Sequence, residues 1–237
     1  MIFKGIQKTS LIEYPGKLAT VLFVGGCNFR CPICHNADLV LNPDKLPTIT
    51  EDEVFELLNK RQGVIEAVVI SGGEPTLNPE LPDFIKKIKA LGLLVEMETN
   101  GTNFEMVKNL MAQNLVDYWA VDIKAPLSDP DLYYKIIGQC GDKSKILDNI
   151  SKTVELIKNS DCPSEFRTTY VPDLLDEAAF LKIASDLKGA KRYAIVGFRP
   201  VNNLDANFSQ KMNWPEAVFL NIKDKIKDCF GEIVIRN

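Results

Sequence analysis

The sequence contains a single histidine, His35, among its 237 residues. It therefore has no pair of histidines for acid–base catalysis or for a nucleophilic triad. Positive charge is not in excess either, because 28 Lys and Arg stand against 32 Asp and Glu, a formal net charge of −4. Nucleic-acid scaffolds usually carry a basic excess, so we expect no nucleic-acid partner.

Long hydrophobic runs are also missing. No apolar stretch approaches the roughly 18–20 residues that span a bilayer. The first residues, through Lys17, lack the apolar stretch and small-residue cleavage site of a secretory signal. We therefore expect no membrane association and a cytoplasmic location. The chain also shows neither an internal repeat nor a low-complexity linker, and its length fits one large α/β domain or two small ones.

What the sequence does contain is an alternation of apolar, strand-like runs with amphipathic segments. The expected strands are 19–24, 67–70, 93–97, 118–123, 166–171, 193–198 and 232–235. The expected helices are 50–61, 81–91, 104–113, 144–159, 177–187 and 214–229. For the first helix, Thr50 and Glu53 have the spacing of a capping box. The alternation predicts an α/β fold with a parallel sheet covered on both faces and about six strand–helix units, fewer than the eight of a closed barrel.

Polar motifs follow four of the expected strands directly. CNFRCPIC comes after the first strand, SGGEP after the second, ETNG after the third and DIKAP after the fourth. Parallel strands end at one edge of their sheet, where α/β proteins place their chemistry. We therefore expect these motifs to form one shared site.

Three of the six cysteines, Cys27, Cys31 and Cys34, lie within eight residues, and the others are scattered. Three thiolates on a tight loop can bind three corners of an iron–sulfur cubane, whose full set would be four. The missing fourth ligand leaves one iron open to another molecule. With His35, the same cysteines could instead form a Cys3His zinc site. The isolated Cys140, Cys162 and Cys229 are expected to be ordinary thiols.

The segment CNFRCPIC resembles the signature of the radical S-adenosylmethionine (SAM) superfamily, and Gly72–Pro75 resembles the superfamily's GGEP motif. ETNG and DIK are similar to later SAM-contacting strand ends of that superfamily. The resemblance implies a partial (β/α)6 barrel of the radical SAM type, a single domain over 1–237 with its core at about 18–200 and a C-terminal helix and strand at 214–236. It also implies one [4Fe–4S] cluster on the three clustered cysteines and SAM bound to the open iron.

The resemblance also assigns SAM contacts. Ile33 stands where an aromatic residue is usual and implies an apolar contact to adenine. Glu98 is expected to pair with the SAM ammonium, and Lys124 to balance the SAM carboxylate or the cluster's charge, or else to pair with Asp122. The complete implied set is Ile33, Asn36, Gly72, Gly73, Glu98, Asn100, Asp122, Lys124 and Arg199.

The segment from Gln7 to Asn36 closely resembles activating proteins of anaerobic ribonucleoside-triphosphate reductase and, more distantly, pyruvate formate-lyase activating enzyme. This implies a radical that removes hydrogen from a glycine of a partner. The partner would be a glycyl-radical enzyme such as that reductase, with flavodoxin or ferredoxin as electron donor. Two alternatives remain open: a radical SAM enzyme acting on a small molecule, such as 7-carboxy-7-deazaguanine synthase, and a non-enzymatic zinc-binding module.

Overall fold

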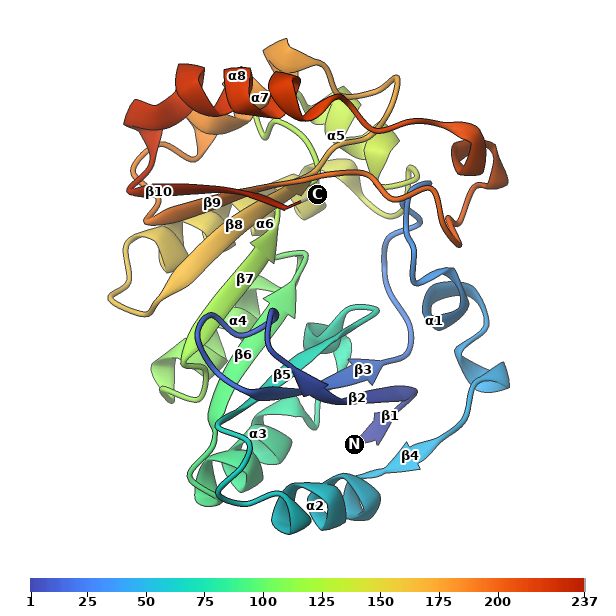
Figure 1. Ribbon diagram of the computed structural model, residues 1–237, viewed down its shortest axis with the longest axis vertical. Helices are drawn as coiled ribbons and strands as arrows, with labels where there is room; N and C mark the ends of the chain where they lie inside the picture. Colours follow the sequence, from blue (N-terminus) through green and yellow to red (C-terminus); the bar gives the residue numbers. More distant parts are fainter. Residues whose placement is uncertain (237) are drawn as a thin grey trace. The chain divides into compact units, whose positions relative to one another are not determined.

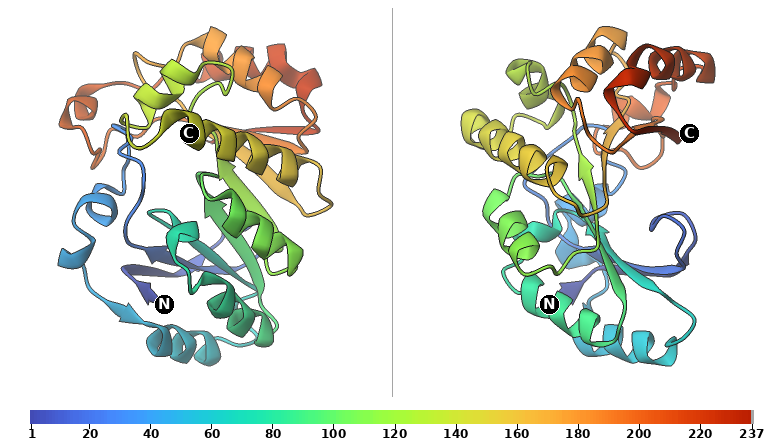
Figure 2. Two further views of the ribbon diagram at one scale, coloured as in Figure 1. Left: turned by 180° about the vertical axis from the view of Figure 1, so that it is seen from behind. Right: turned by 90° about the vertical axis from the view of Figure 1, so that its left-hand side faces the viewer.

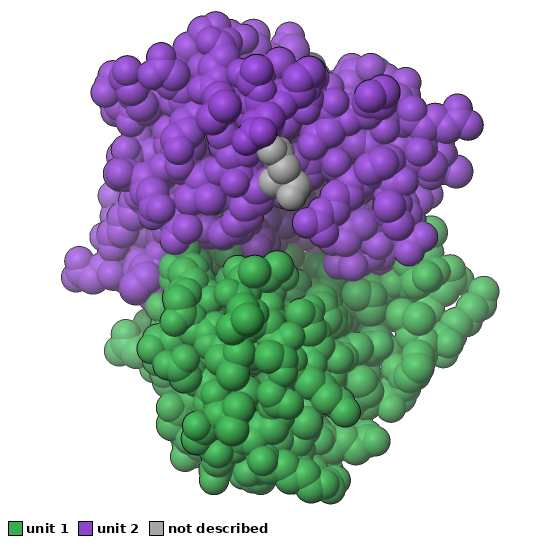
Figure 3. Space-filling model, viewed as in Figure 1, with its two compact units in different colours: residues 1–27, 38–99, 103–120 green, residues 28–37, 100–102, 121–237 purple. Residues whose placement is uncertain are grey.

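The computed structural model describes residues 1–236. The chain forms two compact units, which Figure 3 distinguishes by colour. Unit 1 comprises residues 1–27, 38–99 and 103–120, and unit 2 comprises 28–37, 100–102 and the chain from 121 onward. Because neither unit is one continuous stretch of sequence, the division does not correspond to two domains arranged one after the other.

Unit 1 is built on parallel strands (Figure 1). Strand β5 (Ala67–Gly72) lies between β3 (Ala19–Val24) and β6 (Leu94–Thr99), and it is parallel to both. The edge strand β2 (Gly5–Ser10) runs antiparallel to β3. Two short segments, β1 (Ile2–Phe3) and β4 (Ile49–Thr50), form a separate antiparallel pair.

Strand β7 (Tyr118–Asp122) starts in unit 1 and ends in unit 2. In unit 2, β8 (Ser164–Thr169), β9 (Arg192–Val196) and β10 (Glu232–Arg236) are parallel neighbours. Read through β7, the strand order is β2-β3-β5-β6-β7-β8-β9-β10. Among residues 1–236 the sheet does not close into a barrel, because β2 and β10 are its two edges. The expected α/β class with an open, mostly parallel sheet is confirmed.

Eight α-helices connect the strands within the described part of the chain. They are α1 (Ala37–Leu41), α2 (Glu51–Lys60), α3 (Leu81–Ala90), α4 (Phe104–Ala112), α5 (Pro130–Ile136), α6 (Lys143–Lys158), α7 (Glu177–Asp186) and α8 (Glu216–Ile226). In unit 1, α3 and α4 lie on the same face of the strands (Figure 2). In unit 2, α8 packs against both α7 and β10. No helix within residues 1–236 is long and apolar enough to cross a membrane.

Local sequence explains several element boundaries. The predicted capping box at α2 is present: the Glu53 N–H donates to the Thr50 hydroxyl at 3.3 Å, and the Thr50 N–H donates to the Glu53 carboxylate at 2.7 Å. Helix α8 begins at Glu216, after Pro215, and not at 214 as expected. Strand β8 begins two residues earlier than expected, at Ser164.

Strand β2 and helix α5 were not among the elements expected from the sequence. Strand β2 is mostly polar because, as an edge strand, it exposes much of its length. Helix α5 has only seven residues and starts with Pro130, so it is too short to show a clear helical period.

The core of unit 1 is a packed cluster on one face of its strands. Alternate residues of neighbouring strands supply it, because successive side chains point to opposite faces. Its buried members are Tyr14, Ala19, Val21, Ala67, Val69, Tyr118 and Ala120. The opposite face is equally buried, with Val68 and Ile70 both fully covered. Burial on both faces is the reason that these strands read as continuous apolar runs.

Candidate functional site

The cysteine loop leaves unit 1 through a pair of glycines at the end of β3. Gly26 has φ +83°, a left-handed backbone that favours glycine. Its N–H donates to the Leu39 carbonyl at 2.8 Å, and its carbonyl accepts from the Glu74 N–H at 2.8 Å. The residue just before Cys27 is therefore fixed from two sides by backbone hydrogen bonds.

The backbone of the GGEP motif packs directly against the backbone of the segment that leads from β3 to Cys27. A Cβ built on Gly73 would lie 1.8 Å from the Gly26 carbonyl oxygen, and one built on Gly72, at φ +116°, would lie 2.4 Å from the Val24 carbonyl oxygen. The Gly73 N–H also donates to the Val24 carbonyl at 2.9 Å. At both glycines, a side chain would therefore clash with neighbouring backbone atoms. The sequence analysis had expected these glycines to make room for a ligand and not for the chain's own backbone.

The three clustered cysteines are each partly exposed, so a bound group can reach them. In unit 2, the loop makes a turn in which the Cys34 N–H donates to the Cys31 carbonyl at 3.0 Å. Among residues 1–236, no three His, Cys, Asp or Glu side chains are gathered as ligands of a single ion. A cluster has a different requirement, because each thiolate binds a separate iron. The donor set of three accessible thiols on one supported loop fits such a group.

Backbone from two distant segments holds this loop in unit 2. The Arg30 N–H donates to the Ile137 carbonyl at 2.9 Å, just after α5. At the other end of the loop, the Leu204 N–H donates to the Cys34 carbonyl at 3.0 Å, and the Asp205 N–H donates to the Pro32 carbonyl at 2.9 Å. Sequence reasoning missed these supports, because backbone carbonyls and N–H groups leave no residue-type signal.

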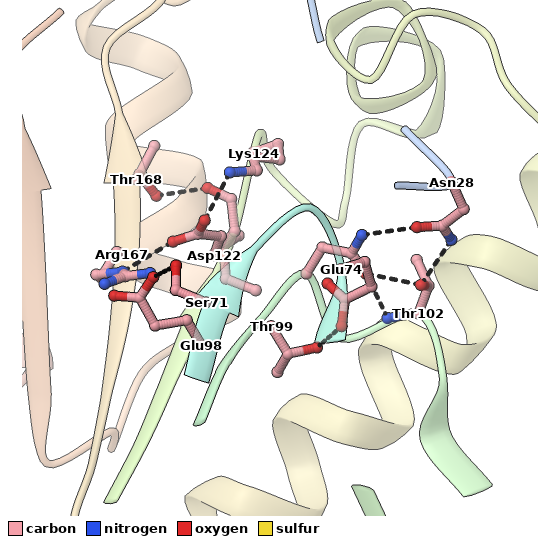
Figure 4. A network of polar contacts seen from close by, with 12 residues as sticks. Asn28, Ser71, Glu74, Glu98, Thr99, Thr102, Asp122, Lys124, Arg167 and Thr168 are labelled. Atoms are coloured by element: carbon pink, nitrogen blue, oxygen red, sulfur yellow. Dashed lines mark hydrogen bonds and ion pairs between the residues drawn. The ribbon is translucent and has the colours of Figure 1, made fainter. Parts of the chain in front are cut away.

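Asn100 joins the cysteine loop to the ETNG segment. Its amide nitrogen donates to the Asn28 side-chain oxygen at 2.9 Å, and its own oxygen accepts from the Thr102 hydroxyl at 2.6 Å. The Asn28 amide in turn donates to the Thr102 hydroxyl at 2.8 Å (Figure 4). Beneath them, the Thr153 hydroxyl donates to the Gly101 carbonyl at 2.8 Å. Asn100 thereby organises the residue next to Cys27, whereas a contact to SAM stays a prediction.

Glu74 is a buried carboxylate in unit 1, only 1% exposed. It accepts from the Thr76 hydroxyl at 2.6 Å. It also accepts from the Thr99 hydroxyl at 2.7 Å (Figure 4). These bonds tie the GGEP segment to the end of β6, where Glu98 lies. Glu98 is half-buried and accepts a hydrogen bond from the Ser71 hydroxyl.

Asp122 and Lys124 form the ion pair that the sequence analysis had left as an alternative. The Lys124 ammonium donates to Asp122 at 2.8 Å, and the Arg167 Nε donates to the other carboxylate oxygen at 2.8 Å. Burial by itself would raise the pKa of Asp122, but Arg167 and then Lys124 hold the pKa of that carboxyl well below its ordinary value. Arg167, on β8, was not among the predicted site residues.

Lys124 interacts electrostatically with Cys31 of the cysteine loop. Burial alone would lower the pKa of this amine, but Asp122 and then the negative charge of a Cys31 thiolate raise it, so that the pKa lies above its ordinary value. The backbone N–H of Lys124 donates to the Tyr133 hydroxyl of α5 at 3.4 Å. Unit 2 therefore places a fixed positive charge near Cys31, which suits an anionic cluster.

The remaining predicted residues differ in exposure. Ile33 and Asn36 are half-buried in the cysteine loop, and Arg199 is exposed beyond the end of β9. Unit 1 brings Gly72 and Gly73 to the approach to Cys27, and unit 2 brings Asn100 and Lys124 to the rest of the loop. Within each unit the polar motifs do follow the strand ends, while the single shared site stays a prediction.

Comparison with known proteins identifies the relatives of this chain. A family model described as the Radical SAM superfamily matches residues 21–183. A Methanocaldococcus jannaschii protein with the provisional name glycyl-radical enzyme activating enzyme is 34% identical over 237 residues, covering 99% of this chain and 95% of its own. The pyruvate formate-lyase-activating enzyme of Clostridium pasteurianum is 29% identical over 214 residues, covering 88% of this chain and 85% of its own.

Among solved structures, the crystal structure of Streptococcus suis SuiB bound to S-adenosylmethionine matches with a TM-score of 0.68 at 13% identity. The match covers 92% of this chain and 52% of SuiB, so the chain spans about half the length of that structure. At this identity the likeness establishes the fold alone.

Proposed function

The chain belongs to the radical SAM superfamily, and we propose that it activates a glycyl-radical enzyme by means of SAM and a [4Fe–4S] cluster held by Cys27, Cys31 and Cys34. As a member of this superfamily it is an oxidoreductase that uses SAM and an iron–sulfur cluster. A non-enzymatic zinc-binding module is therefore no longer an alternative. One observation carries the activating role: 34% identity along 99% of the chain to a protein named for that activity.

The arrangement of this chain's own residues supports the cofactor assignment. When bound, the cluster supplies the electron that splits SAM into methionine and a 5′-deoxyadenosyl radical, which would take a hydrogen atom from a partner's glycine. Cys31 and Cys34 are held by a loop with backbone support at both ends. Lys124 offers a positive charge beside that loop. Rigid support matters because radical chemistry depends on positioning.

The other proposed contacts divide by role. Glu98 would receive the SAM ammonium, since its carboxylate is half-buried and already oriented by Ser71. Gly72 and Gly73 would offer backbone carbonyls, and Ile33 and Asn36 would line the cysteine loop's side of the ligand. Asp122 would orient Lys124 through their ion pair. Arg199 remains a proposed contact to the ribose or carboxylate of SAM.

The experiment tests SAM cleavage and the partner together. The reconstituted protein is reduced with dithionite and incubated anaerobically with SAM, alone and with a candidate anaerobic ribonucleoside-triphosphate reductase. Chromatography measures 5′-deoxyadenosine, and electron paramagnetic resonance detects a glycyl radical. A glycyl signal that depends on SAM supports the proposal. Replacing dithionite by flavodoxin or by ferredoxin then tests the physiological electron donor.

Two results would change the proposal in different ways. Production of 5′-deoxyadenosine with conversion of a small molecule, and no glycyl signal, would leave the superfamily assignment in place and overturn the activating role. The chain would then resemble enzymes such as 7-carboxy-7-deazaguanine synthase in its type of substrate. A fully reconstituted cluster that never cleaves SAM would overturn the proposed chemistry itself.

A further inference from the structure

Helix α5 contacts both the cysteine loop and the segment that carries Lys124. Its Tyr133 is fully buried and accepts the hydrogen bond from the Lys124 N–H. Directly after the helix, the Ile137 carbonyl accepts from the Arg30 N–H, one residue before Cys31. Helix α5 and the residue after it therefore hold both the backbone of Lys124 and the backbone of Arg30, next to Cys31. The distance between these two segments sets the strength of the electrostatic interaction between Lys124 and Cys31.

Gly138 is the point of closest approach between this helix end and the loop. A Cβ built on Gly138 would lie 2.3 Å from the Arg30 carbonyl oxygen and 2.8 Å from both the Arg30 carbonyl carbon and its Cβ. Two of these three atoms belong to the backbone, which cannot rotate away as a flexible side chain would. Any side chain at Gly138 must therefore move Arg30, and with it Cys31.

We propose that the C-terminal turn of α5, through Gly138, is a positioning element for the loop that carries Cys31 and Cys34. Gly138 has no proposed contact with the cofactor; it acts by letting the Ile137 carbonyl reach the Arg30 N–H. The inference depends on the iron–sulfur cluster of the superfamily and not on which partner the enzyme activates.

Gly138 is also favoured by the backbone conformation at the end of α5, and the experiment must distinguish this local role from the contact with Arg30. Gly138 has φ +82° and ends α5, with its N–H donating to the Lys135 carbonyl at 3.2 Å. Helices often end with a glycine in this conformation, and any residue with a Cβ is strained there. A loss of stability in Gly138→Ala alone would therefore prove nothing.

The chain supplies a matched control at Gly92. It follows α3 at the same position, has φ +78°, and its N–H donates to the Lys89 carbonyl at 2.9 Å. A Cβ built there would meet nothing within 4 Å. Gly92→Ala therefore has the strain of a side chain at positive φ but no steric clash with a neighbouring segment. A difference in iron retention between Gly138→Ala and Gly92→Ala then reports the effect of the close contact with Arg30.

The experiment uses full-length protein reconstituted anaerobically with iron and sulfide. Iron per chain is measured, and an iron chelator is titrated to find the concentration that removes half of the iron. Groups that support metal ligands typically change metal affinity by about 10- to 100-fold when altered. We expect that chelator concentration to fall about tenfold in Gly138→Ala and to stay near the wild-type value in Gly92→Ala. The spectrum of the reduced cluster in electron paramagnetic resonance should change only in Gly138→Ala.

Folding is checked by circular dichroism before reconstitution, and Gly138→Asn is measured in parallel, because asparagine adopts the left-handed backbone more readily. Loss of iron in a folded Gly138→Asn protein supports the inference even if Gly138→Ala folds poorly. Equal iron retention and equal spectra in the Gly138→Asn and Gly92→Ala proteins would overturn it. None of these measurements involves SAM cleavage or a partner, so this inference and the proposed activating role can fail independently.

Discussion

The carbonyl oxygen of Gly26 occupies the space in which a side chain at Gly73 would begin, since a Cβ on Gly73 would fall 1.8 Å from that oxygen. Gly26 directly precedes Cys27. The GGEP motif therefore supports the backbone that leads to the first cysteine. This contact connects a motif predicted to bind SAM with the loop that carries the three clustered cysteines.

The first prediction concerns that contact. Gly73→Ala must displace the backbone at Gly26, so we expect the cluster-free protein to lose about 1–3 kcal/mol of stability, as overpacked cores do. Bound iron after reconstitution should fall as well. Gly5→Ala is the control, because the atom nearest to its Cβ would be a side-chain carbon of Phe23 at 3.4 Å, an ordinary van der Waals distance. Urea unfolding and iron analysis measure both effects, and wild-type iron retention in Gly73→Ala would contradict the prediction.

The second prediction concerns the ligands of the cluster. Alanine in place of any one of Cys27, Cys31 or Cys34 should abolish the visible absorption that appears on anaerobic reconstitution, because three thiolates already leave one iron without a protein ligand. The same substitution at Cys140, Cys162 or Cys229 should leave the absorption intact. Loss of the cluster in Cys140→Ala, with the fold preserved, would show that the ligand set is wrong.

The third prediction concerns pH and the ion pair of Asp122. In the folded protein its pKa lies below the ordinary value of 3.8. The unfolded chain therefore binds the proton more tightly, so the stabilisation is complete above about pH 4 and is lost as the pH falls through the folded pKa. At pH 7, Asp122→Asn should destabilise the protein by about 2 kcal/mol, the scale of hydrogen bonds to charged groups.

The measurement is urea unfolding of wild type and Asp122→Asn at falling pH, as far as cooperative transitions persist. The difference in the free energy of unfolding between the two proteins should shrink once the pH drops below the ordinary pKa of the carboxyl. A difference that stays constant down to that range would mean that the charge of Asp122 contributes little. Asp161 is exposed, so Asp161→Asn serves as a comparison for the general effect of removing one carboxylate.

The fourth prediction separates SAM binding from cluster assembly. Glu98→Ala should lower the rate of SAM cleavage about tenfold, equivalent to about 1.4 kcal/mol, while iron per chain stays unchanged. Ser71→Ala removes the hydroxyl that orients Glu98 but keeps the carboxylate, so its effect should be smaller. Quantifying 5′-deoxyadenosine against iron content tests this. Parallel losses of iron and cleavage in Glu98→Ala would assign Glu98 a structural role.

The sequence alone determined the α/β class, most of the parallel strands and the positions of the polar motifs after them. It could do so because a strand buried on both faces must be apolar along its length, as Val68, Val69 and Ile70 are in β5. The spacing of Cys27, Cys31 and Cys34 predicted an iron–sulfur cluster for a similar reason, since ligand chemistry depends on residue type and local separation.

Only the tertiary structure decided how the loop with these cysteines is held. The Ile137 carbonyl reaches Arg30 across more than one hundred residues of chain, and Leu204 reaches Cys34 across a still longer stretch. Arg167 likewise meets Asp122 from another strand. Contacts of this kind depend on which backbone groups the fold brings together and leave no periodic or compositional trace. Gly73 and Gly138 show the same limit: the sequence reveals two glycines, but only the fold reveals the carbonyl oxygens that a side chain at either position would have to displace.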